Sequence, residues 1–542
     1  MDKNLPILVE NYSFQYHSRS ELALNSLSFE VHPGEVLLIA GSSGCGKTTL
    51  MRSINGLIPY TYRGEYQGDI KLFGKSVFDL KMVDISQTVG TVLQDPERQI
   101  VASFVFNEIA FGLENLGLPK KEIFQRIDQV LEYLNIGYLR ERETFQLSGG
   151  EKQKVVLAGV LAMNPKILLL DEPLASLDPA SAQESLQVFR KLADDGISVI
   201  VVEHRVEDVL KINPERVLYM EEGKISYLGD VNGLLEVVDY SKIKLPAPVI
   251  IERARKQPTE NKFEEKELNA ILDKKPLVKF KSVHFRYKPE LPDVLRNITF
   301  DINMGDVIAI LGPNGAGKTT LVKHALGLLK PTRGEVTLED RNTTDISVAQ
   351  CAHTIGYVFQ SPTQMLFAPT VEAELSFGPK NLGHPADKIT ENIEWAINTV
   401  NLQSELKTPP LALSFGQQKR VSIASVLAMR SRVLMMDEPT AGQDYWNYQS
   451  FMDSILKMQG FDAVLFITHD VDLAVIYANR VLLVNNGELI ADGSPYEVLS
   501  DEERLKQSRV IPTSLLRLNL EHYARTKKFY RAEALAQLIP SG

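Results

Sequence analysis

Two glycine-rich peptides of this 542-residue chain have the spacing of a phosphate-binding loop. "GSSGCGKTTL" begins at Gly41, and "GPNGAGKTTL" begins at Gly312. In the pattern G-x-x-x-x-G-K-[ST] the glycines let backbone N–H groups face phosphate oxygens, and the following helix N-terminus adds partial positive charge. Each copy follows an apolar run and precedes a helix-like sequence. Because a chance glycine-rich turn would not recur twice in this context, the peptides predict two ATP sites.

Within these loops the lysines, Lys47 and Lys318, are predicted to reach the β- and γ-phosphates. The threonines that follow them, Thr48 and Thr319, are predicted to bind Mg²⁺. The predicted nucleotide-binding loop residues are Gly41, Ser42, Ser43, Gly44, Cys45, Gly46, Lys47, Thr48 and Thr49 in the first copy, and Gly312, Pro313, Asn314, Gly315, Ala316, Gly317, Lys318, Thr319 and Thr320 in the second.

Cys45 lies between two glycines of the first loop. We expect maleimide to react with this thiol and block the first site, and ATP to protect it. The alternative is a thiol that points away from the nucleotide as a small filler without access.

Two apolar runs, "ILLLDEP" and "VLMMDEP", end in a pair of acids. An aspartate at a strand end beside a phosphate loop can hold Mg²⁺, which assigns this role to Asp171 and Asp437. The next residues, Glu172 and Glu438, are predicted to polarise the attacking water as general bases. A solvated acidic turn is the alternative, but both acids recur in both copies.

Four further side chains follow apolar runs at matching places. His204 ends "VIVVEH" and His469 ends "LFITH", which predicts two contacts to a γ-phosphate rather than two structural histidines. Gln94 and Gln360 open the related peptides "QDP" and "QSP". We predict that these glutamines complete the Mg²⁺ shell or sense the γ-phosphate; a surface role is the alternative.

Tyr16 and Tyr287 each lie 31 residues before the lysine of their phosphate loop. An aromatic face at this place could stack on adenine. The alternative is that both rings pack within a strand.

These landmarks recur in the same order with offsets of 265 to 271 residues, which indicates a domain duplication. We predict a first domain at 1–239, a linker at 240–276, a second domain at 277–500 and a helical C-terminal appendage at 501–542. The first copy carries five extra residues within 59–67. Short apolar runs such as "VLLIA" and "VIAIL" alternate with helical segments such as "KEIFQRIDQVLEYLNI". This alternation predicts an α/β fold with a parallel sheet in each copy.

The bulk composition restricts the class of protein. The net charge of −10 disfavours nucleic acid as a partner, because such binding depends on neutralising phosphates. Two isolated cysteines make neither a disulfide framework nor a zinc cluster. The N-terminus does not resemble a secretory signal, and no run reaches the roughly 18 apolar residues that span a bilayer. We expect a cytosolic protein that is peripheral on the membrane.

The full set of motifs resembles the ATP-binding-cassette (ABC) ATPases: two phosphate loops, a glutamine after a strand, "LSGGEKQ" and "LSFGQQK", the "DEP" pairs, a "SLD" turn and a final histidine. The resemblance covers nearly all of both domains. It implies two tandem cassettes, each with a mainly parallel sheet core, an antiparallel β subdomain and a helical subdomain. It also implies that the cassettes pair head to tail, so that each signature peptide serves the ATP bound by the other cassette. The signature residues implied to contact ATP are Ser148, Gly149, Gly150, Ser414, Gly416 and Gln417.

The two signatures differ, because Phe415 stands where the first has Gly149. A phenyl group beside the phosphates either turns outward or holds the signature back. The turns before the histidines also differ, with 176–178 reading "SLD" and 442–444 reading "GQD". We therefore expect the first ATP site, which pairs Lys47 with the second signature, to hydrolyse ATP more slowly than the second.

The peptides "QDPERQ…FNEIAFGLENLGLP" and "QSPTQ…VEAELSFGPKNLGHP" resemble the duplicated ATPase component of energy-coupling-factor importers of vitamins and metal ions. This resemblance implies two further chains, a transmembrane scaffold and a substrate-binding membrane subunit, with the segment around 108–119 facing the scaffold. A tandem ATPase of a monosaccharide importer is one alternative, although the second phosphate loop is intact. A soluble cassette protein acting on ribosomes or DNA is another. The transported solute is not encoded in this chain.

Overall fold

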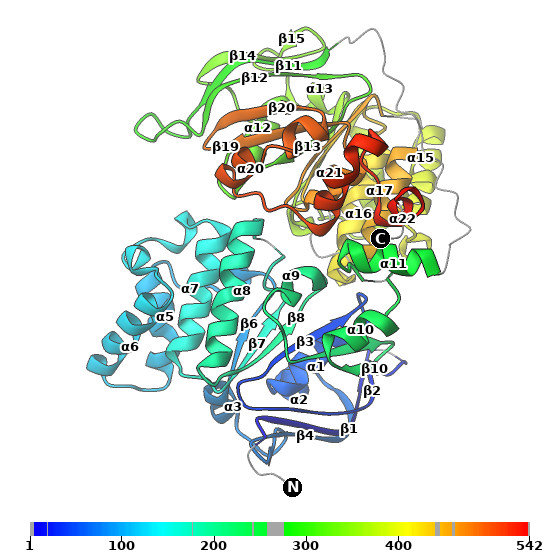
Figure 1. Cartoon of the computed structure of the whole chain (residues 1–542). Coiled ribbons are helices and arrows are strands. Elements are labelled where there is room, and N and C mark those ends of the chain that lie inside the picture. The colour runs from blue at the N-terminus through cyan, green and yellow to red at the C-terminus, as the bar shows by residue number, and fades with distance from the viewer. Residues whose placement is uncertain are drawn as a thin grey trace. The chain divides into compact units, whose positions relative to one another are not determined.

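The computed structural model describes residues 5–18, 20–175, 177–240, 243–256, 276–439, 445–457 and 461–539. The chain divides into two compact units, Met1–Leu245 and Pro246–Gly542 (Figure 1). Much of the predicted linker lies outside the described residues, although 247–256 form a helix that belongs to the second unit. The domain limits at 239, 276 and 500 stay predictions.

Each unit contains a six-stranded sheet in which one edge strand is antiparallel and all other pairs are parallel. In the first unit the order is β10 (Lys224–Gly229), β9 (Arg216–Glu221), β3 (Val36–Gly41), β8 (Ser198–Val202), β7 (Ile167–Asp171) and β6 (Val89–Val92). In the second it is β16 (Ile355–Val358), β17 (Val433–Asp437), β18 (Ala463–Ile467), β13 (Val307–Leu311), β19 (Arg480–Asn485) and β20 (Glu488–Gly493). The central strands are buried along their whole length because helices cover parallel sheets. The predicted α/β fold is confirmed.

An antiparallel four-stranded sheet accompanies each parallel sheet, as the family resemblance implies. The first consists of β2 (Leu24–Val31), β1 (Ile7–Tyr16), β4 (Gly64–Leu72) and β5 (Lys75–Ser76). The second consists of β12 (Leu295–Asn303), β11 (Pro276–Phe285), β14 (Arg333–Leu338) and β15 (Arg341–Asn342). In each unit the two sheets share one apolar core with the helix that follows the phosphate loop. That shared core holds the phosphate loop between the sheets.

Part of the five-residue insertion of the first copy lengthens strand β4, which has nine residues where β14 has six. This strand pairs with β1 as far as Tyr16 opposite Gly64, whereas the shorter β14 reaches only His284 opposite Arg333. The turn before it is α2 (Leu57–Tyr60). The insertion therefore extends the β subdomain beside Tyr16.

Helices cover the parallel sheets and build a helical subdomain in each unit. In the first unit these helices are α1 (Lys47–Ile54), α3 (Met82–Thr88), α4 (Pro96–Gln99), α5 (Val105–Asn115), α6 (Lys120–Tyr133), α7 (Gly149–Ala162), α8 (Pro179–Asp194), α9 (Val206–Leu210) and α10 (Val231–Val237). In the second they are α12 (Lys318–Ala325), α13 (Val348–Ala352), α14 (Val371–Asn381), α15 (Ala386–Thr399), α16 (Phe415–Ala428), α17 (Tyr445–Lys457), α18 (Val471–Tyr477) and α19 (Pro495–Leu499). Among the described residues, no helix combines the length and the apolar character needed to cross a bilayer.

A helical appendage completes the second unit. It contains α11 (Ala247–Lys256), α20 (Glu502–Gln507), α21 (Ser514–Thr526) and α22 (Ala532–Leu538). The backbone N–H of Ala247 donates to Ser514 Oγ at 2.8 Å, and Arg255 donates to the carbonyl of Ile539 at 2.8 Å. Segments about 270 residues apart in the chain are thus packed into one appendage.

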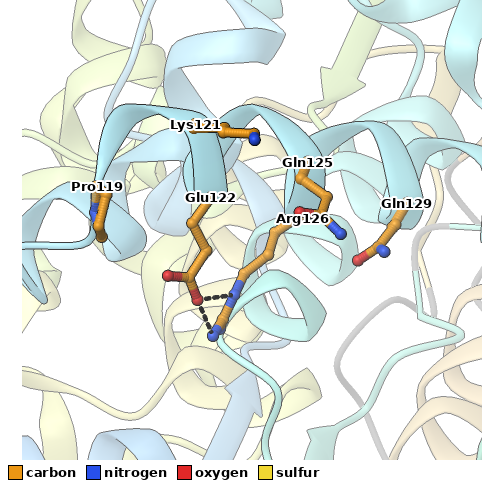
Figure 2. Close-up of a pocket in the computed structure, with 6 residues that line it drawn as sticks. All are labelled: Pro119, Lys121, Glu122, Gln125, Arg126 and Gln129. Carbon is orange, nitrogen blue, oxygen red and sulfur yellow. Dashed lines mark hydrogen bonds and ion pairs between the residues drawn. The ribbon is translucent and has the colours of Figure 1, made fainter.

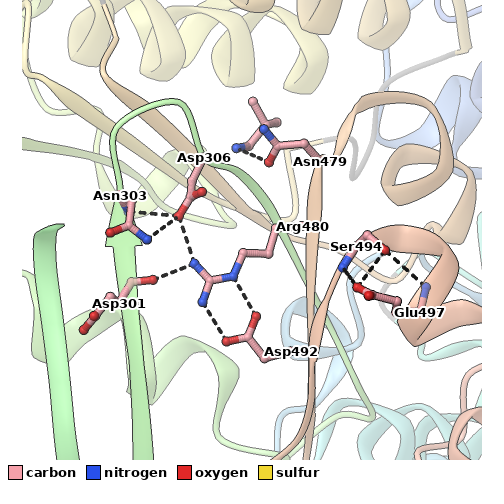
Figure 3. A network of polar contacts seen from close by, with 9 residues as sticks. Asp301, Asn303, Asp306, Asn479, Arg480, Asp492, Ser494 and Glu497 are labelled. Carbon is pink, nitrogen blue, oxygen red and sulfur yellow. Dashed lines mark hydrogen bonds and ion pairs between the residues drawn. The ribbon is translucent and has the colours of Figure 1, made fainter. Parts of the chain in front are cut away.

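A partly buried polar network anchors the edge of the second parallel sheet (Figure 3). Arg480, the first residue of β19, donates twice to Asp492 at 2.6 Å and once to Asp306 at 2.9 Å. It also donates to the carbonyl of Asp301 at 2.8 Å. The guanidinium therefore joins both sheets of this unit, because Asp301 lies on β12 and Asp492 on β20.

Candidate nucleotide-binding sites

The two phosphate loops lie where the sequence places them, between a buried strand and a helix. Gly46 and Gly317 precede α1 and α12 with φ of 108° and 98°, and neither helix start has a side-chain cap. The first N–H groups of these helices are therefore not taken by a capping side chain, which suits an anion.

The loop lysines curl back over their own loops. Lys47 Nζ donates to the carbonyls of Gly41 and Ser42, both at 2.8 Å, and Lys318 makes the same two bonds to Gly312 and Pro313. Both side chains are buried. These bonds close each loop around the ammonium group of its own lysine.

The central glycines test whether the loops fit a phosphate. Gly44 and Gly315 have φ of 82° and 78°, and no atom lies within 4 Å of the place where a Cβ would stand. Open space on the backbone of a loop, together with positive φ, lets phosphate oxygens approach the N–H groups. The loops therefore fit the triphosphate that the sequence predicts.

Both predicted general bases occupy a strained backbone conformation. Glu172 and Glu438 each have φ of 46°, a region that non-glycine residues rarely adopt. The N–H groups of these residues donate to the carbonyls of Val202 and Ile467 on the neighbouring strands at 2.9 and 3.0 Å. Such strain persists only where the surroundings impose it, and it is concentrated at functional sites.

The neighbouring strands bring the histidines to these carboxylates. His204 Nε2 lies 3.0 Å from Glu172 Oε1, and His469 Nε2 lies 3.1 Å from Glu438 Oε1. In the first unit Gln94 Nε2 also donates to Glu172 Oε2 at 2.7 Å. The structure thus joins three predicted residues in the first unit and two in the second.

The predicted metal ligands form oxygen-donor pairs. Thr319 Oγ1 donates to Asp437 Oδ2 at 2.7 Å, and Thr48 hydrogen-bonds to Asp171. Hydroxyl and carboxylate oxygens are the donors that Mg²⁺ prefers. Over the described parts of the chain, no group of three or more His, Cys, Asp or Glu side chains could hold a metal. The threonine–carboxylate pairs fit the predicted Mg²⁺.

Burial acts on the pKa of carboxyl groups in both acidic pairs. Burial, reinforced by Glu172, raises the pKa of Asp171 to about 6. Burial likewise raises the pKa of Glu438 to about 8, against the opposing field of Lys318. For Glu172 burial acts in the same direction, but the adjacent His204 outweighs it and the net pKa is lowered.

Both predicted adenine-stacking tyrosines are anchored beside the phosphate loops. The hydroxyls of Tyr16 and Tyr287 lie 3.1 Å from Thr49 Oγ1 and Thr320 Oγ1 respectively. Tyr287 is 55% exposed. A fixed, accessible ring suits stacking, which stays a prediction.

The two signature serines cap the helices that they begin. Ser148 Oγ donates to Glu151 at 2.8 Å at the start of α7, and Ser414 Oγ donates to Gln417 at 2.9 Å at the start of α16. Both form a capping box. The serine partner is therefore an acid in the first unit and a neutral amide in the second. Residue 176, the turn 442–444 and the side chain of Phe415 lie outside the described part.

Cys45 is buried, so its thiol has little access to solvent. The side chain is only 4% exposed and belongs to the apolar core of the first unit. Its Sγ lies 3.8 Å from Lys47 Nζ. The burial favours the alternative of a thiol that fills space in the core without access, so slow reaction with maleimide is expected in the folded chain.

Two buried residues of the second unit escaped the sequence reasoning. Tyr357 donates to Asp437 Oδ2 at 3.1 Å, and burial together with that carboxylate raises the tyrosine pKa. Lys419, in helix α16, is fully buried, and burial lowers its pKa to about 8. Comparing the two copies position by position would have singled out both residues as differences between the copies. The first copy has Thr91 where the second has Tyr357, and Gln153 where the second has Lys419.

A separate open pocket of about 420 Å³ lies along helix α6 (Figure 2). The Arg126 side chain there donates to Glu122 Oε1 at 2.6 and 3.1 Å. None of the predicted nucleotide-binding residues lines it; the lining residues are Pro119, Lys121, Glu122, Gln125, Arg126 and Gln129.

Comparison with known proteins places the chain in a family. A family model described as "ABC transporter" matches residues 24–175 and 295–441. A provisionally named ABC transporter ATP-binding protein of Clostridium perfringens is 35% identical over 549 residues, covering 96% of each chain. A similar protein of Bacillus cereus is 34% identical over 538 residues, covering 94% of this chain and 95% of the other. A solved structure, cbiO1 from Clostridium perfringens, described as part of the ABC transporter complex cbiONQ, is 30% identical. It covers 48% of this chain and 99% of its own, with a TM-score of 0.39.

Proposed function

This chain belongs to the ABC transporter ATP-binding proteins, and from that membership we propose that it is the ATP-hydrolysing subunit of an importer of the energy-coupling-factor type. The imported solute would be a vitamin, a vitamin precursor or a metal ion. A transmembrane scaffold and a substrate-binding membrane subunit would be separate chains, and this chain would act at the cytoplasmic face of the membrane. The Gln-loop peptides that resemble this importer group support the proposal.

The chemistry proposed for each site follows from its contacts. Lys47 and Lys318 release the loop carbonyls and bind the β- and γ-phosphates instead. Thr48 and Asp171, and Thr319 and Asp437, would hold a Mg²⁺ ion that would neutralise phosphate charge. Glu172 and Glu438 accept the proton of the attacking water, and the histidines that touch them hold each carboxylate in place.

The signature serines are assigned to the same reaction. Ser148 and Ser414 are exposed residues at the N-caps of α7 and α16, so each places a hydroxyl and a helix N-terminus where an anion could approach. As the family resemblance implies, Ser148 and Gly150 would serve the ATP on the second loop, and Ser414 and Gly416 the ATP on the first.

One surface feature carries the proposal of a membrane partner. At matching places of the two units, an apolar pair is half exposed or more: Val101 at 64% and Phe111 at 50%, and Phe367 at 61% and Phe377 at 51%. Two aromatic side chains of the second pair meet edge to face, with centroids 4.8 Å apart. Exposed apolar side chains repeated at one place on each unit suit a partner that covers both.

The loop beneath each pair is held rigidly by a glutamate. Glu108 Oε2 accepts the N–H groups of Val101 and Ala102 at 2.9 and 2.7 Å. Glu374 accepts those of Phe367 and Ala368 at 2.9 and 2.8 Å. A preorganised apolar surface next to the Gln-loop is suited to couple the ATP site to a scaffold subunit.

Purification from membranes tests this proposal. The chain should be recovered with an integral membrane complex, whose subunits are identified by mass spectrometry. The Phe111→Asp/Phe377→Asp variant should lose those subunits and still bind ATP. Val237→Asp, which changes a residue 61% exposed on α10, should keep them. Recovery with ribosomes instead, or membrane binding that survives the double change, would contradict the proposal.

A further inference from the structure

The Gln-loop of the first cassette is clamped by a glutamine side chain. Gln99 Oε1 accepts the N–H of Leu93 at 2.9 Å, and Gln99 Nε2 donates to the carbonyl of Thr91 at 2.8 Å. These bonds fix the backbone of Thr91 and Leu93, on the segment that leads into Gln94. The amide of Gln94 then reaches Glu172 at 2.7 Å. A single side chain thus places the loop for its contact with the general base.

The second cassette lacks that clamp, because Met365 stands where the first cassette has Gln99. The N–H of Phe359 points at the Met365 sulfur at 3.4 Å. A thioether is a weak acceptor and has no hydrogen to donate. Met365 therefore reproduces one half of the clamp weakly and cannot reproduce the other half.

A buried lysine supplies the missing restraint from another direction. Lys419 Nζ donates to the carbonyls of Phe359 and Gln360 at 2.9 and 2.7 Å. The first cassette has Gln153 at this place, and its amide instead donates to the carbonyl of Pro173, the residue after Glu172. Both replacements affect the Gln-loop of the second cassette. Met365 weakens the restraint from within the loop, and Lys419 adds a restraint from helix α16.

The burial of Lys419 indicates a specific role for its charge. Its residue exposure is 0%, and an ammonium group without partners is costly to bury. The two carbonyls satisfy two of its three donors, and the carboxylates of Asp437 and Glu438 act on its charge. Bonds from a charged donor are stronger than the neutral amide bonds of the first cassette.

We propose that Lys419 is the positioning residue of the second ATP site: it ties signature helix α16 to the Gln-loop and thereby sets the backbone of Gln360. The assignment of Gln360 to Mg²⁺ or the γ-phosphate rests on the proposed function; the restraint itself does not. The two cassettes then hold their Gln-loops by different means, Gln99 within the first loop and Lys419 from the signature helix of the second.

Hydrogen exchange of the nucleotide-free full-length chain, read by mass spectrometry on a peptide covering 355–367, tests the restraint. Lys419→Met keeps the bulk and removes the donors, and Lys419→Gln introduces the residue of the first cassette. Loss of charge-assisted bonds should speed exchange of this peptide by roughly 10- to 100-fold. The matching peptide 89–101 of the first cassette serves as the internal control and should not change.

Rescue separates positioning from a general loss of stability. Met365→Gln combined with Lys419→Gln rebuilds the clamp of the first cassette and should restore slow exchange at 355–367. Unchanged exchange in both single variants, equal acceleration in both cassettes, or failure of the double variant to rescue would each overturn the proposal.

Single-turnover hydrolysis at the second site, measured on the same variants, distinguishes this inference from the proposed function. We expect the rate to fall with Lys419→Met and to recover in the double variant. Local exchange and rescue without any change in hydrolysis would uphold the restraint by Lys419 and contradict the role proposed for Gln360.

Discussion

Replacing Glu172 and Glu438 with glutamine removes two carboxylates and almost nothing of their shape. Each carboxylate contacts a histidine at 3.0 or 3.1 Å, and each backbone is fixed by the neighbouring strand. Glutamine can keep these contacts, because its amide offers one acceptor and donors at the same places. It cannot accept a proton from water. The change therefore isolates proton transfer from the shape of the site.

The expected magnitude follows from the role of a general base. Such a group contributes about 10²–10⁴-fold to a rate, so the double variant should lose at least about 100-fold in single-turnover hydrolysis. ATP affinity should change little, since the lysines proposed to bind phosphate are held by the loops and not by the glutamates. Glu184→Gln on helix α8, an exposed partner of Lys154, is the matched control and should hydrolyse ATP normally.

The assay measures three quantities on each variant: bound nucleotide at equilibrium, single-turnover hydrolysis and the thermal unfolding midpoint. Among the single variants, Glu438→Gln should lower hydrolysis more than Glu172→Gln, because we expect the second site to be faster. Hydrolysis in the double variant within about two-fold of the unmodified chain would refute the general-base assignment.

Four further predictions concern single features of the chain. Phe415→Gly should raise the rate of hydrolysis at the first site by roughly 10- to 100-fold, because the phenyl group is expected to cost one charge-assisted hydrogen bond. Counting trapped nucleotide at each site measures this rate. Equal rates at the two sites of the unmodified chain would contradict the prediction. Thr319→Ala removes a donor to Asp437, so half-maximal hydrolysis at the second site should need more Mg²⁺. Chelation of Mg²⁺ should stop hydrolysis at both sites. An unchanged Mg²⁺ titration curve for the variant would argue against the assignment of Thr319 as a ligand. Because the Cys45 thiol is buried, maleimide should label it slowly in the folded chain and quickly in denaturant; equal rates would show that the thiol is accessible. Arg480→Ala leaves the buried Asp306 carboxylate without its guanidinium partner. This change should lower the free energy of unfolding of the second unit by about 3 kcal/mol in a denaturant titration. A change below about 1 kcal/mol would contradict the prediction.

Much of the fold could be predicted because its signals are local. The predicted strands "VLLIA" and "VIAIL" are β3 and β13, and the helical segment at 121–136 contains most of α6. The antiparallel sheets were implied only by the family resemblance. Their pairing joins β1 to β4, which are separated by some fifty residues, and no local pattern specifies such a partner.

The candidate sites divide in the same way. The phosphate loops and the adjacent acids could be read from the sequence, because each is a run of consecutive residues whose chemistry depends on local backbone geometry. The contact of Gln94 with Glu172 spans 78 residues, and it exists because parallel strands end at one edge of the sheet.

Only the tertiary structure decided the orientation of Cys45 and the burial of Lys419. A thiol between glycines and a lysine in a polar helical segment both suggest accessible groups from sequence alone. Cys45 is buried because the core of the first unit closes over it, and Lys419 is buried because the Gln-loop lies across its helix. Residue type and spacing determine which groups can do chemistry; the packing of distant segments determines which of them meet water, nucleotide or core.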